Sequence, residues 1–403
     1  MTAILLICCS LLGWTGCKNT HSEDAKPVAP EVNVSDIRTG AERTEAYIGL
    51  LEGKRVGLVV NQTSQINGVL LPDTLISHGI NVAKIFAPEH GFRGDAAEGA
   101  MVKDGIDVKT GVPILSIYGK KKKPAESDLS GLDIIVFDIQ DVGARFYTYI
   151  STMHYVMEAA AENGIPFMVL DRPNPNGFYV DGPILNPEQS SFVGMHQVPI
   201  VHGMTIGEYA QMINGEGWLD NGVKCELTVI KCSDYSHTDK YALPVNPSPN
   251  LRTMTSIYLY PSICLFEGTQ VSVGRGTEHP FEQFGSPYGM FYSYVFVPKR
   301  SGSYTPLFAD KECFGQNLTI MPVDSIANGK LNLSYLLGMY DVFSEKDNFF
   351  RKDGFFNLLA GSTQLRTQIE AGLKEDEIRL SWQEGLIRFK EIRKKYLLYP
   401  DFE

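Results

Sequence analysis

Four segments of this 403-residue sequence bring carboxylates, arginines and amides together beside turn-forming residues. Core packing does not require that combination, whereas a polar binding site does. Glutamate and aspartate can act as general acids and bases, and arginine and amide side chains can hold a polar substrate. The four segments are FAPEHGFRG (86–94), FDIQDVGARFYTY (137–149), LDRPNPNG (170–177) and VSVGRGTEHPFEQFGSP (271–287).

The first of these segments places Glu89 and His90 directly after an apolar run that predicts a strand, and Gly91 permits a sharp turn there. A glutamate at the exposed end of a strand has little to pack against, so we expect Glu89 to have a functional role. His90 could take part in the chemistry or only support Glu89. In open α/β sheets, ligands bind at the edge formed by the carboxyl ends of the strands, which is where Glu89 is expected.

The remaining groups suit a sugar, because amides and carboxylates bond to hydroxyl groups and aromatic faces stack on the apolar side of the ring. Structural roles are an open alternative. Asp138 and Asp171 could cap helices or form turns, Arg145 and Arg172 could be their ion-pair partners, and His202 could simply precede a helix. The candidate substrate-binding residues are His90, Arg93, Asp138, Gln140, Asp141, Arg145, Tyr147, Asp171, Arg172, Asn174, Asn176, His202, Asn250 and Arg275.

Hydrophobic runs indicate the elements that must position these groups. Apolar strands alternating with helices predict a parallel sheet covered on both faces, which is a Rossmann-like α/β fold. The loop after the first strand lacks a G-x-G-x-x-G pattern, so we expect no dinucleotide cofactor. Helices are predicted at 148–162 and 205–215, and strands at 54–61, 81–87, 112–118, 132–139, 165–170 and 225–231.

From about residue 245 the sequence becomes loop-rich, aromatic and punctuated by Gly and Pro. We expect a strand at 317–322, a helix at 331–343 and a long final helix from about residue 374. The whole is predicted to form a Rossmann-like domain at 36–245 and a smaller α+β domain at 246–403, with the active site in the cleft between them. A stripe at helical spacing in the final helix predicts core packing: Ile378, Trp382, Phe389, Ile392 and Tyr396.

The N-terminus resembles a bacterial lipoprotein signal, because residues 1–17 run from a short apolar stretch through Gly16 to Cys17, after which the sequence turns polar. We expect lipid modification of Cys17 after cleavage, with residues 18–35 as a tether. The protein would then be an exported lipoprotein of the periplasm or cell envelope that meets the membrane through its lipid anchor only. An ordinary secretory signal cleaved nearby is the alternative.

Composition and missing motifs exclude other classes. A formal net charge of −11 argues against a nucleic-acid partner, and no apolar run after residue 17 approaches the ~20 residues of a spanning helix. No H-E-x-x-H, D-x-D-x-D-G or G-x-S-x-G pattern occurs, so we expect neither a metal nor a serine nucleophile. A metal held by Glu89, His90, Asp138 and Asp141 is the weaker alternative. Four cysteines are expected as buried free thiols: Cys225, Cys232, Cys264 and Cys313.

The same segments resemble the NamZ-type exo-β-N-acetylmuramidases. The resemblance rests on APEHGFRG, FDIQDVGARFYTY, DRPNPNG, PSPNLRT, YPS, FEGT, GRGTEHPFEQFG and the closing SWQEGLIRFKEIRKKYLLYP, and it covers nearly everything from about Leu50 onward. It implies a Rossmann-like domain with a smaller C-terminal domain. The implied activity is hydrolysis of terminal, non-reducing N-acetylmuramic acid from peptidoglycan fragments, so the expected partners are muramyl glycans or muropeptides.

On this resemblance Glu89 matches the catalytic glutamate, and we expect it to act as a general acid whose pKa is raised by partial burial. The second catalytic group is expected to be His279, Glu278 or Glu282. Muramic acid carries a lactyl carboxylate, which a guanidinium can hold bidentately. The residue that contacts this carboxylate is expected to be Arg93, Arg145, Arg172 or Arg275. The rival hypotheses are a non-catalytic wall-binding lipoprotein and a metal-dependent esterase or amidase.

Overall fold

The computed structural model describes residues 37–89, 91–93, 104–302 and 304–403. The predicted signal and tether, Cys17 and His90 lie outside these residues. The main element is a seven-stranded sheet of order β5-β6-β4-β1-β7-β8-β9, in which every neighbouring pair is parallel except β5 and β6. Its strands are β1 (Arg55–Val60), β4 (Asn81–Ala87), β5 (Gly105–Ile106), β6 (Pro113–Ser116), β7 (Ile134–Asp138), β8 (Phe167–Leu170) and β9 (Leu227–Ile230).

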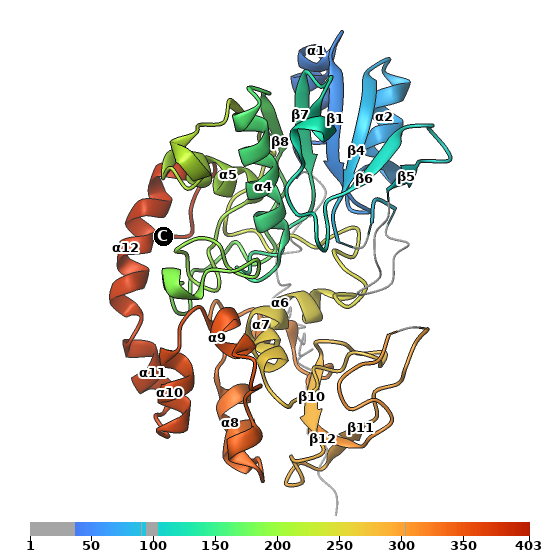
Figure 1. The fold of residues 1–403 in the computed structure, drawn as a ribbon. Coiled ribbons are helices and arrows are strands. Elements are labelled where there is room, and N and C mark those ends of the chain that lie inside the picture. Colours follow the sequence, from blue (N-terminus) through green and yellow to red (C-terminus); the bar gives the residue numbers. More distant parts are fainter. Residues whose placement is uncertain (1–36, 90, 94–103, 303) are drawn as a thin grey trace, which may run out of the picture. The chain divides into compact units, whose positions relative to one another are not determined.

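Helices cover both faces of this sheet (Figure 1). Along β1, Leu58 packs into one hydrophobic cluster and Val59 into the other, because successive side chains of a strand point to opposite faces. The first cluster is completed by α1 (Thr44–Leu51) and α2 (Leu71–Ser77). The second is completed by α4 (Tyr149–Glu162) and α5 (Ile206–Gly215). The predicted Rossmann-like architecture is confirmed.

The strand order places a topological switch beside β1. The chain runs from β1 to β4 and β6 on one side, and then returns to β7, β8 and β9 on the other. The loops that follow the carboxyl ends of β1 and β7 therefore leave the sheet in opposite directions. Open α/β sheets bind ligands in the crevice between two such loops. The sheet domain also contains these smaller elements: β2 (Gln65–Ile66), β3 (Val69–Leu70), α3 (Glu126–Leu129) and the 3-10 turns η1 (Pro187–Gln189) and η2 (Asp220–Gly222).

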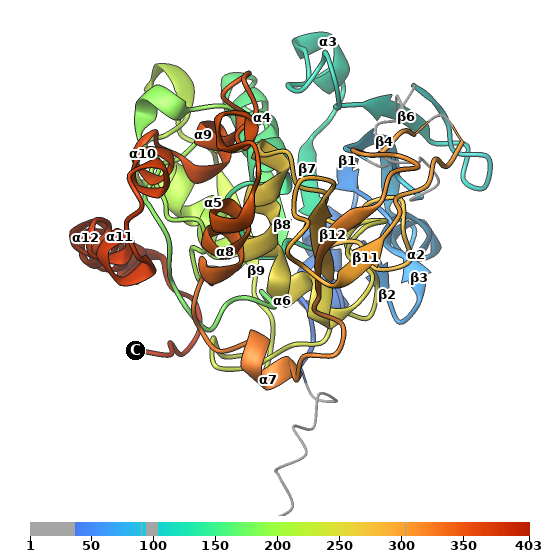
Figure 2. The same ribbon diagram turned by 90° about the horizontal axis from the view of Figure 1, so that it is seen from below.

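The C-terminal region begins with α6 (Met254–Ile263) and the 3-10 turn η3 (Cys264–Gly268). It contains an antiparallel sheet of order β10-β12-β11. In both views, α8 lies between this sheet and the helices α10 and α11 (Figures 1 and 2). The remaining elements are β10 (Gln283–Ser286), β11 (Tyr294–Phe296), β12 (Cys313–Asn317), α7 (Val323–Ile326), α8 (Ser334–Val342), η4 (Lys346–Asn348), α9 (Phe355–Ala360), α10 (Gln364–Glu370), α11 (Glu375–Leu380), α12 (Gln383–Arg393) and η5 (Lys394–Tyr396).

Two sequence predictions in this region are wrong. The strand expected at 317–322 is instead β12, which ends at Asn317, because the Asn317 side chain accepts hydrogen bonds from the backbone N–H and hydroxyl of Thr319 and turns the chain. The final helix is divided at Trp382, whose φ of −112° and ψ of 0° are not helical. The predicted packing stripe is nonetheless in the core, since Ile378, Trp382 and Phe389 are buried.

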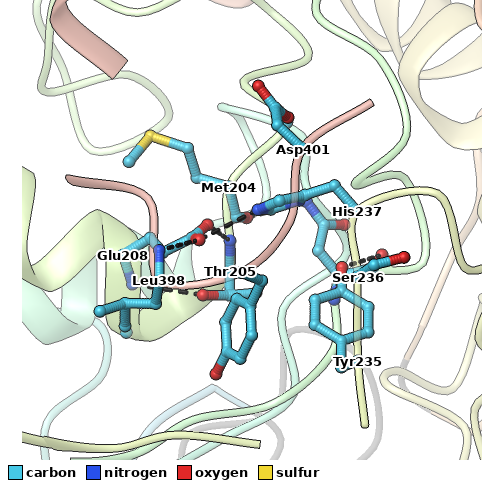
Figure 3. A network of polar contacts seen from close by, with 12 residues as sticks. Met204, Thr205, Glu208, Tyr235, Ser236, His237, Leu398 and Asp401 are labelled. Atoms are coloured by element: carbon cyan, nitrogen blue, oxygen red, sulfur yellow. Dashed lines mark hydrogen bonds and ion pairs between the residues drawn. The ribbon is translucent and has the colours of Figure 1, made fainter. Parts of the chain in front are cut away.

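The C-terminal segment of the chain is held against the first turn of α5 (Figure 3). Glu208, in the first turn of α5, accepts hydrogen bonds from the Leu398 backbone N–H (2.8 Å) and pairs with His237 Nε2 (3.0 Å). Arg393 forms a bidentate pair with Asp401, with distances of 2.7 and 2.8 Å. Residues Asp36–Glu403 form one compact unit.

Candidate active site

A cavity of about 180 Å³ contains Glu89 and is lined from both parts of the chain. The sheet domain supplies Glu89 and the stretch Phe146–Tyr149, which precedes and begins α4. The C-terminal region supplies Glu267 and Arg275. The cavity thus lies where the sheet edge meets the second region, as the sequence led us to expect. Its other lining residues are Val193, Ser248, Asn250, Leu251, Tyr260 and Phe281.

Glu89 follows the carboxyl end of β4 and is half-buried. Gly91 bonds through its backbone N–H to the Pro88 carbonyl at 3.1 Å and has a φ of +76°, which confirms the sharp turn. The hydroxyl of Tyr118 donates to Glu89 Oε1 at 2.8 Å, and that of Thr148 donates to Oε2 at 3.4 Å. These two contacts orient the carboxyl group in the cavity, and neither partner was singled out from the sequence. The sequence signal for Tyr118 is its place at the end of the predicted strand 112–118.

Glu267 is the cavity carboxylate that sequence reasoning missed. It lies in η3, and its side chain is 23% exposed. Its Oε1 accepts a hydrogen bond from Arg275 Nε at 2.6 Å, and the thiol of Cys264 donates to Oε2 at 3.5 Å. Burial raises the pKa of Glu267 to about 7, and the nearby charge of Glu89 contributes in the same direction. The hydrogen bond from the Cys264 thiol and the positive charge of Arg351 act in the opposite direction and lower the pKa of Glu267.

Close backbone approaches fix the positions of Glu267 and Arg275. A Cβ atom on Gly268 would lie 2.4 Å from the Cα of Phe356, so only glycine allows η3 to pack this closely on α9. Arg275 lies between Gly274 (φ +78°) and Gly276 (φ +79°), and a Cβ on the latter would lie 2.5 Å from the Lys299 carbonyl oxygen. Two left-handed glycines thus shape the loop that points Arg275 at Glu267.

A second cavity of about 370 Å³ adjoins the first, and Glu267 and Arg275 line both. It also receives Tyr304 and Phe355, and the guanidinium of Arg351 lies 4.9 Å from the ring centroid of Phe355. Its remaining lining residues are Thr269, Gln270, Val271, Ser272, Val273 and Leu307. Aromatic faces beside amide and hydroxyl groups are the surroundings that suit a sugar ring.

The candidate substrate residues divide into two groups. Tyr147, Asn250 and Arg275 line the Glu89 cavity. Tyr147 also donates its hydroxyl to the Pro247 carbonyl at 2.8 Å, so its ring is held in place by the loop before α6. The other described candidates do not line it, and their contacts are within the protein.

Three arginines that could have contacted a substrate carboxylate are engaged in the fold. Arg93 makes a bidentate pair with Asp107, at 2.8 Å for each bond. Arg172 pairs with Asp138 in the same way, at 2.5 and 2.8 Å, and both side chains are buried. Arg145 is fully buried and donates to the carbonyl oxygens of Pro183, Val198 and Leu359. Sequence alone could not separate these arginines from Arg275, because their partners come from distant segments.

The amides and Asp171 hold loops together at the sheet edge. The side chain of Gln140 donates to the carbonyls of Asp141 and Pro173, and the Asn174 side chain donates to the carbonyl of Met204. Asn176 donates to the carbonyls of Val142 and Ile257. Asp171 accepts hydrogen bonds from Thr205, from the Gly207 backbone and from Tyr399.

The proposed second catalytic groups lie outside the Glu89 cavity. Glu278 and His279 are exposed. Glu282 is buried, but it accepts a hydrogen bond from the Thr253 hydroxyl at 2.6 Å and lies 3.5 Å from His279. Its carboxylate therefore binds Thr253, the N-cap residue of α6. Among the described residues, Glu267 is the carboxylate that the structure places beside Glu89.

Asp141 is a buried carboxyl with one unpartnered oxygen. Its Oδ2 accepts from the Gly143 backbone at 2.6 Å and lies 3.8 Å from His202 Nε2, while its Oδ1 has no hydrogen-bond partner. Burial raises the pKa of Asp141 to about 7 and lowers that of His202 to about 3. The histidine is therefore neutral at physiological pH and does not compensate a charge on Asp141.

The raised pKa of Asp141 predicts how the free energy of unfolding changes with pH. An aspartate in the unfolded chain loses its proton near pH 4, whereas Asp141 keeps its proton up to about pH 7 when folded. The folded state binds more protons in that window, so the free energy of unfolding falls as pH rises from about 4 to about 7. We expect Asp141→Asn to remove about 2–4 kcal/mol of that fall, measured by urea unfolding at pH 5 and pH 8. Equal slopes in parent and variant would contradict the assignment.

Within the part of the chain that the structure describes, no group of three or more His, Cys, Asp or Glu side chains is arranged to hold a metal ion. In the same residues, no helix has the length and apolar character needed to cross a membrane. The four cysteines predicted as buried free thiols, at 225, 232, 264 and 313, are confirmed as such.

The protein has an α/β fold, in which a Rossmann-like sheet is joined to a smaller region. The cavity between them contains two carboxyl groups, which are the groups that a glycosidase uses. Two family models match, described as "Exo-beta-N-acetylmuramidase NamZ, N-terminal" over residues 56–255 and "Exo-beta-N-acetylmuramidase NamZ, C-terminal" over residues 258–399. The chain belongs to the NamZ exo-β-N-acetylmuramidase family, and the resemblance found in the sequence is confirmed.

Relatives cover nearly the whole chain. The peptidoglycan β-N-acetylmuramidase NamZ of Bacillus subtilis (strain 168) is 44% identical over 373 residues, which is 88% of this chain and 89% of that protein. A crystal structure of a DUF1343 family protein from Bacteroides fragilis NCTC 9343 has 48% identity and a TM-score of 0.85, and the match covers 91% of this chain and 100% of that one. A second such structure from the same organism has 29% identity and a TM-score of 0.79, over 90% and 99% of the two chains.

Proposed function

We propose that this protein is an exo-acting glycoside hydrolase that releases non-reducing terminal N-acetylmuramic acid from peptidoglycan fragments. The observation that carries the proposal is the Glu89 cavity. In it Glu89, at the carboxyl end of β4, lies together with a second carboxylate, an arginine and aromatic side chains. Membership of the NamZ family supports the same activity.

The chemistry asked of Glu89 is proton donation to the glycosidic oxygen as the bond to the anomeric carbon breaks. Such an acid must be held at a fixed angle to the leaving oxygen. The hydrogen bonds from Tyr118 and Thr148 supply that orientation, since they engage both carboxyl oxygens. Glu89 is therefore the residue on which turnover depends in this proposal.

The acid substituent of the sugar gives Arg275 a second purpose. Of the four arginines considered from the sequence, it is the one that lines the cavity, while Arg93, Arg145 and Arg172 are engaged elsewhere. We assign to Arg275 the contact with the lactyl carboxylate, which distinguishes muramic acid from N-acetylglucosamine. A planar guanidinium suits a carboxylate partner.

The direct test is digestion of a defined glycan that carries N-acetylmuramic acid at its non-reducing end, followed by mass spectrometry. The proposal expects free N-acetylmuramic acid and a glycan shortened by that one residue, with no effect of a chelator. Binding without any release would instead identify a non-catalytic wall-binding protein. Loss of an acyl or amide group that is blocked by the chelator would identify a metal-dependent esterase or amidase.

We also propose that the protein is exported and anchored by lipid on Cys17, which would hold it beside its polymer. The support is the sequence pattern at 1–17, in which Gly16 precedes Cys17. In cells given a labelled fatty acid, the full-length protein is expected to carry label, and Cys17→Ser is expected to carry none. A labelled Cys17→Ser protein would contradict the anchor site.

A further inference from the structure

We propose that Glu267 is the second catalytic carboxylate of the hydrolysis, acting as the general base that accepts a proton from the water attacking the anomeric carbon. This inference rests on the proposed glycosidase function and deepens it. None of the candidates expected from the sequence, Glu278, His279 and Glu282, lines the Glu89 cavity.

Glu89 reaches the cavity from the sheet domain and Glu267 from η3 in the C-terminal region, so the two carboxylates approach one space from separate parts of the fold. Glu267 also borders the adjoining cavity of about 370 Å³, which offers space beside it for water and for part of the glycan. A glycosidase of this type needs its two carboxyl groups on either side of the scissile bond.

The contacts around Glu267 fix its position and suit a general base. Arg275 Nε fixes Oε1 at 2.6 Å, and the Arg351 guanidinium donates to the Glu267 backbone carbonyl at 3.1 Å, so both ends of the residue are tied. Burial raises the pKa of Glu267, whereas the Cys264 hydrogen bond and the charge of Arg351 lower it. Such a balance keeps a base ionised yet able to take a proton near neutral pH. An exposed carboxylate on a surface loop would have neither constraint.

The reaction balances with these two groups. Glu89 gives its proton to the glycosidic oxygen, and the bond from that oxygen to the anomeric carbon breaks. The oxygen of a water molecule forms the new bond to the anomeric carbon, and one proton of that water passes to Glu267. Free muramic sugar and a glycan with a new terminal hydroxyl leave the site, and solvent returns both carboxyl groups to their starting states.

The experiment compares two substrates of the full-length protein, a muramyl disaccharide and the 4-nitrophenyl β-glycoside of N-acetylmuramic acid. Glu267→Gln is expected to lower kcat by about 10³-fold on both, because attack by water needs a base whatever the leaving group. In Glu267→Ala, sodium azide is expected to restore release of 4-nitrophenol and to yield a glycosyl azide, since this nucleophile needs no base. The parent enzyme is expected to release the sugar with inverted configuration, followed by proton NMR.

Controls separate the possible failures. Melting temperatures of the Glu267 variants within a few degrees of the parent exclude unfolding, and azide rescue excludes it independently. Glu282→Gln removes a buried carboxylate from the same region, and a larger loss in that variant than in Glu267→Gln would overturn the assignment. Retained configuration, or Glu267 variants within tenfold of the parent, would also overturn it while leaving the glycosidase function intact. A parent that releases no muramic acid would refute the proposed function itself.

Discussion

Replacing Glu89 by glutamine is expected to lower kcat on a muramyl disaccharide by about 10³-fold, because the amide cannot protonate the departing sugar oxygen. The loss is expected to be much smaller on the 4-nitrophenyl glycoside, since 4-nitrophenolate leaves without a proton. Measuring both substrates therefore reports proton donation itself, and a structural disturbance would lower both rates alike.

Glu42→Gln is the matched control for this prediction. Glu42 is another half-buried glutamate, and it accepts hydrogen bonds from the backbone and hydroxyl of Thr39 at 2.7 and 3.0 Å, away from the cavity. Its substitution is expected to leave both rates within about twofold of the parent. Equal losses on both substrates in Glu89→Gln would reject the acid role.

Replacing Arg172 by alanine is expected to lower the free energy of unfolding by about 3–5 kcal/mol, because it leaves the Asp138 carboxylate buried without its partner. Asp138 is 0% exposed and Arg172 4%, so water cannot replace the lost hydrogen bonds. Urea unfolding measures the change. The folded fraction of the variant is expected to keep its preference for muramic acid, since this pair does not line the cavity.

The exposed pair Arg55 and Asp133 is the comparison for that experiment. Their closest contact is 2.8 Å, but their side chains are 53% and 38% exposed. Arg55→Ala is expected to lower the free energy of unfolding far less than Arg172→Ala does, because solvent screens the exposed pair. A cost for Arg172→Ala no larger than that for Arg55→Ala would contradict the structural role assigned to the buried pair.

The sheet was predictable because its strands are parallel and buried on both faces. The run IIVF at 134–137 is then apolar throughout, and it stands out from Asp133 and Asp138 on either side. The same rule places Glu89 at the carboxyl edge without any knowledge of its neighbours. The break at Trp382 was not predictable from periodicity, because the hydrophobic spacing continues across it.

The second half of the site could not be read from the sequence for a physical reason. Glu267 lies between the apolar residues of η3 and the close-packed Gly268. In the sequence, a glutamate directly before a glycine is typical of an ordinary turn. Only tertiary folding brings it to the cavity that contains Glu89. The arginines give the converse case, since Arg145 and Arg172 have the residue type of a carboxylate-binding site but find their partners inside the fold.

The most direct test of the central claim is a crystal structure of Glu89→Gln with a bound muramyl disaccharide. The account predicts the glycosidic oxygen within about 2.6–3.2 Å of the residue 89 side chain, with the lactyl group toward Arg275. A disaccharide bound in any other part of the molecule, or one whose glycosidic oxygen lies beyond the reach of residue 89, would contradict it.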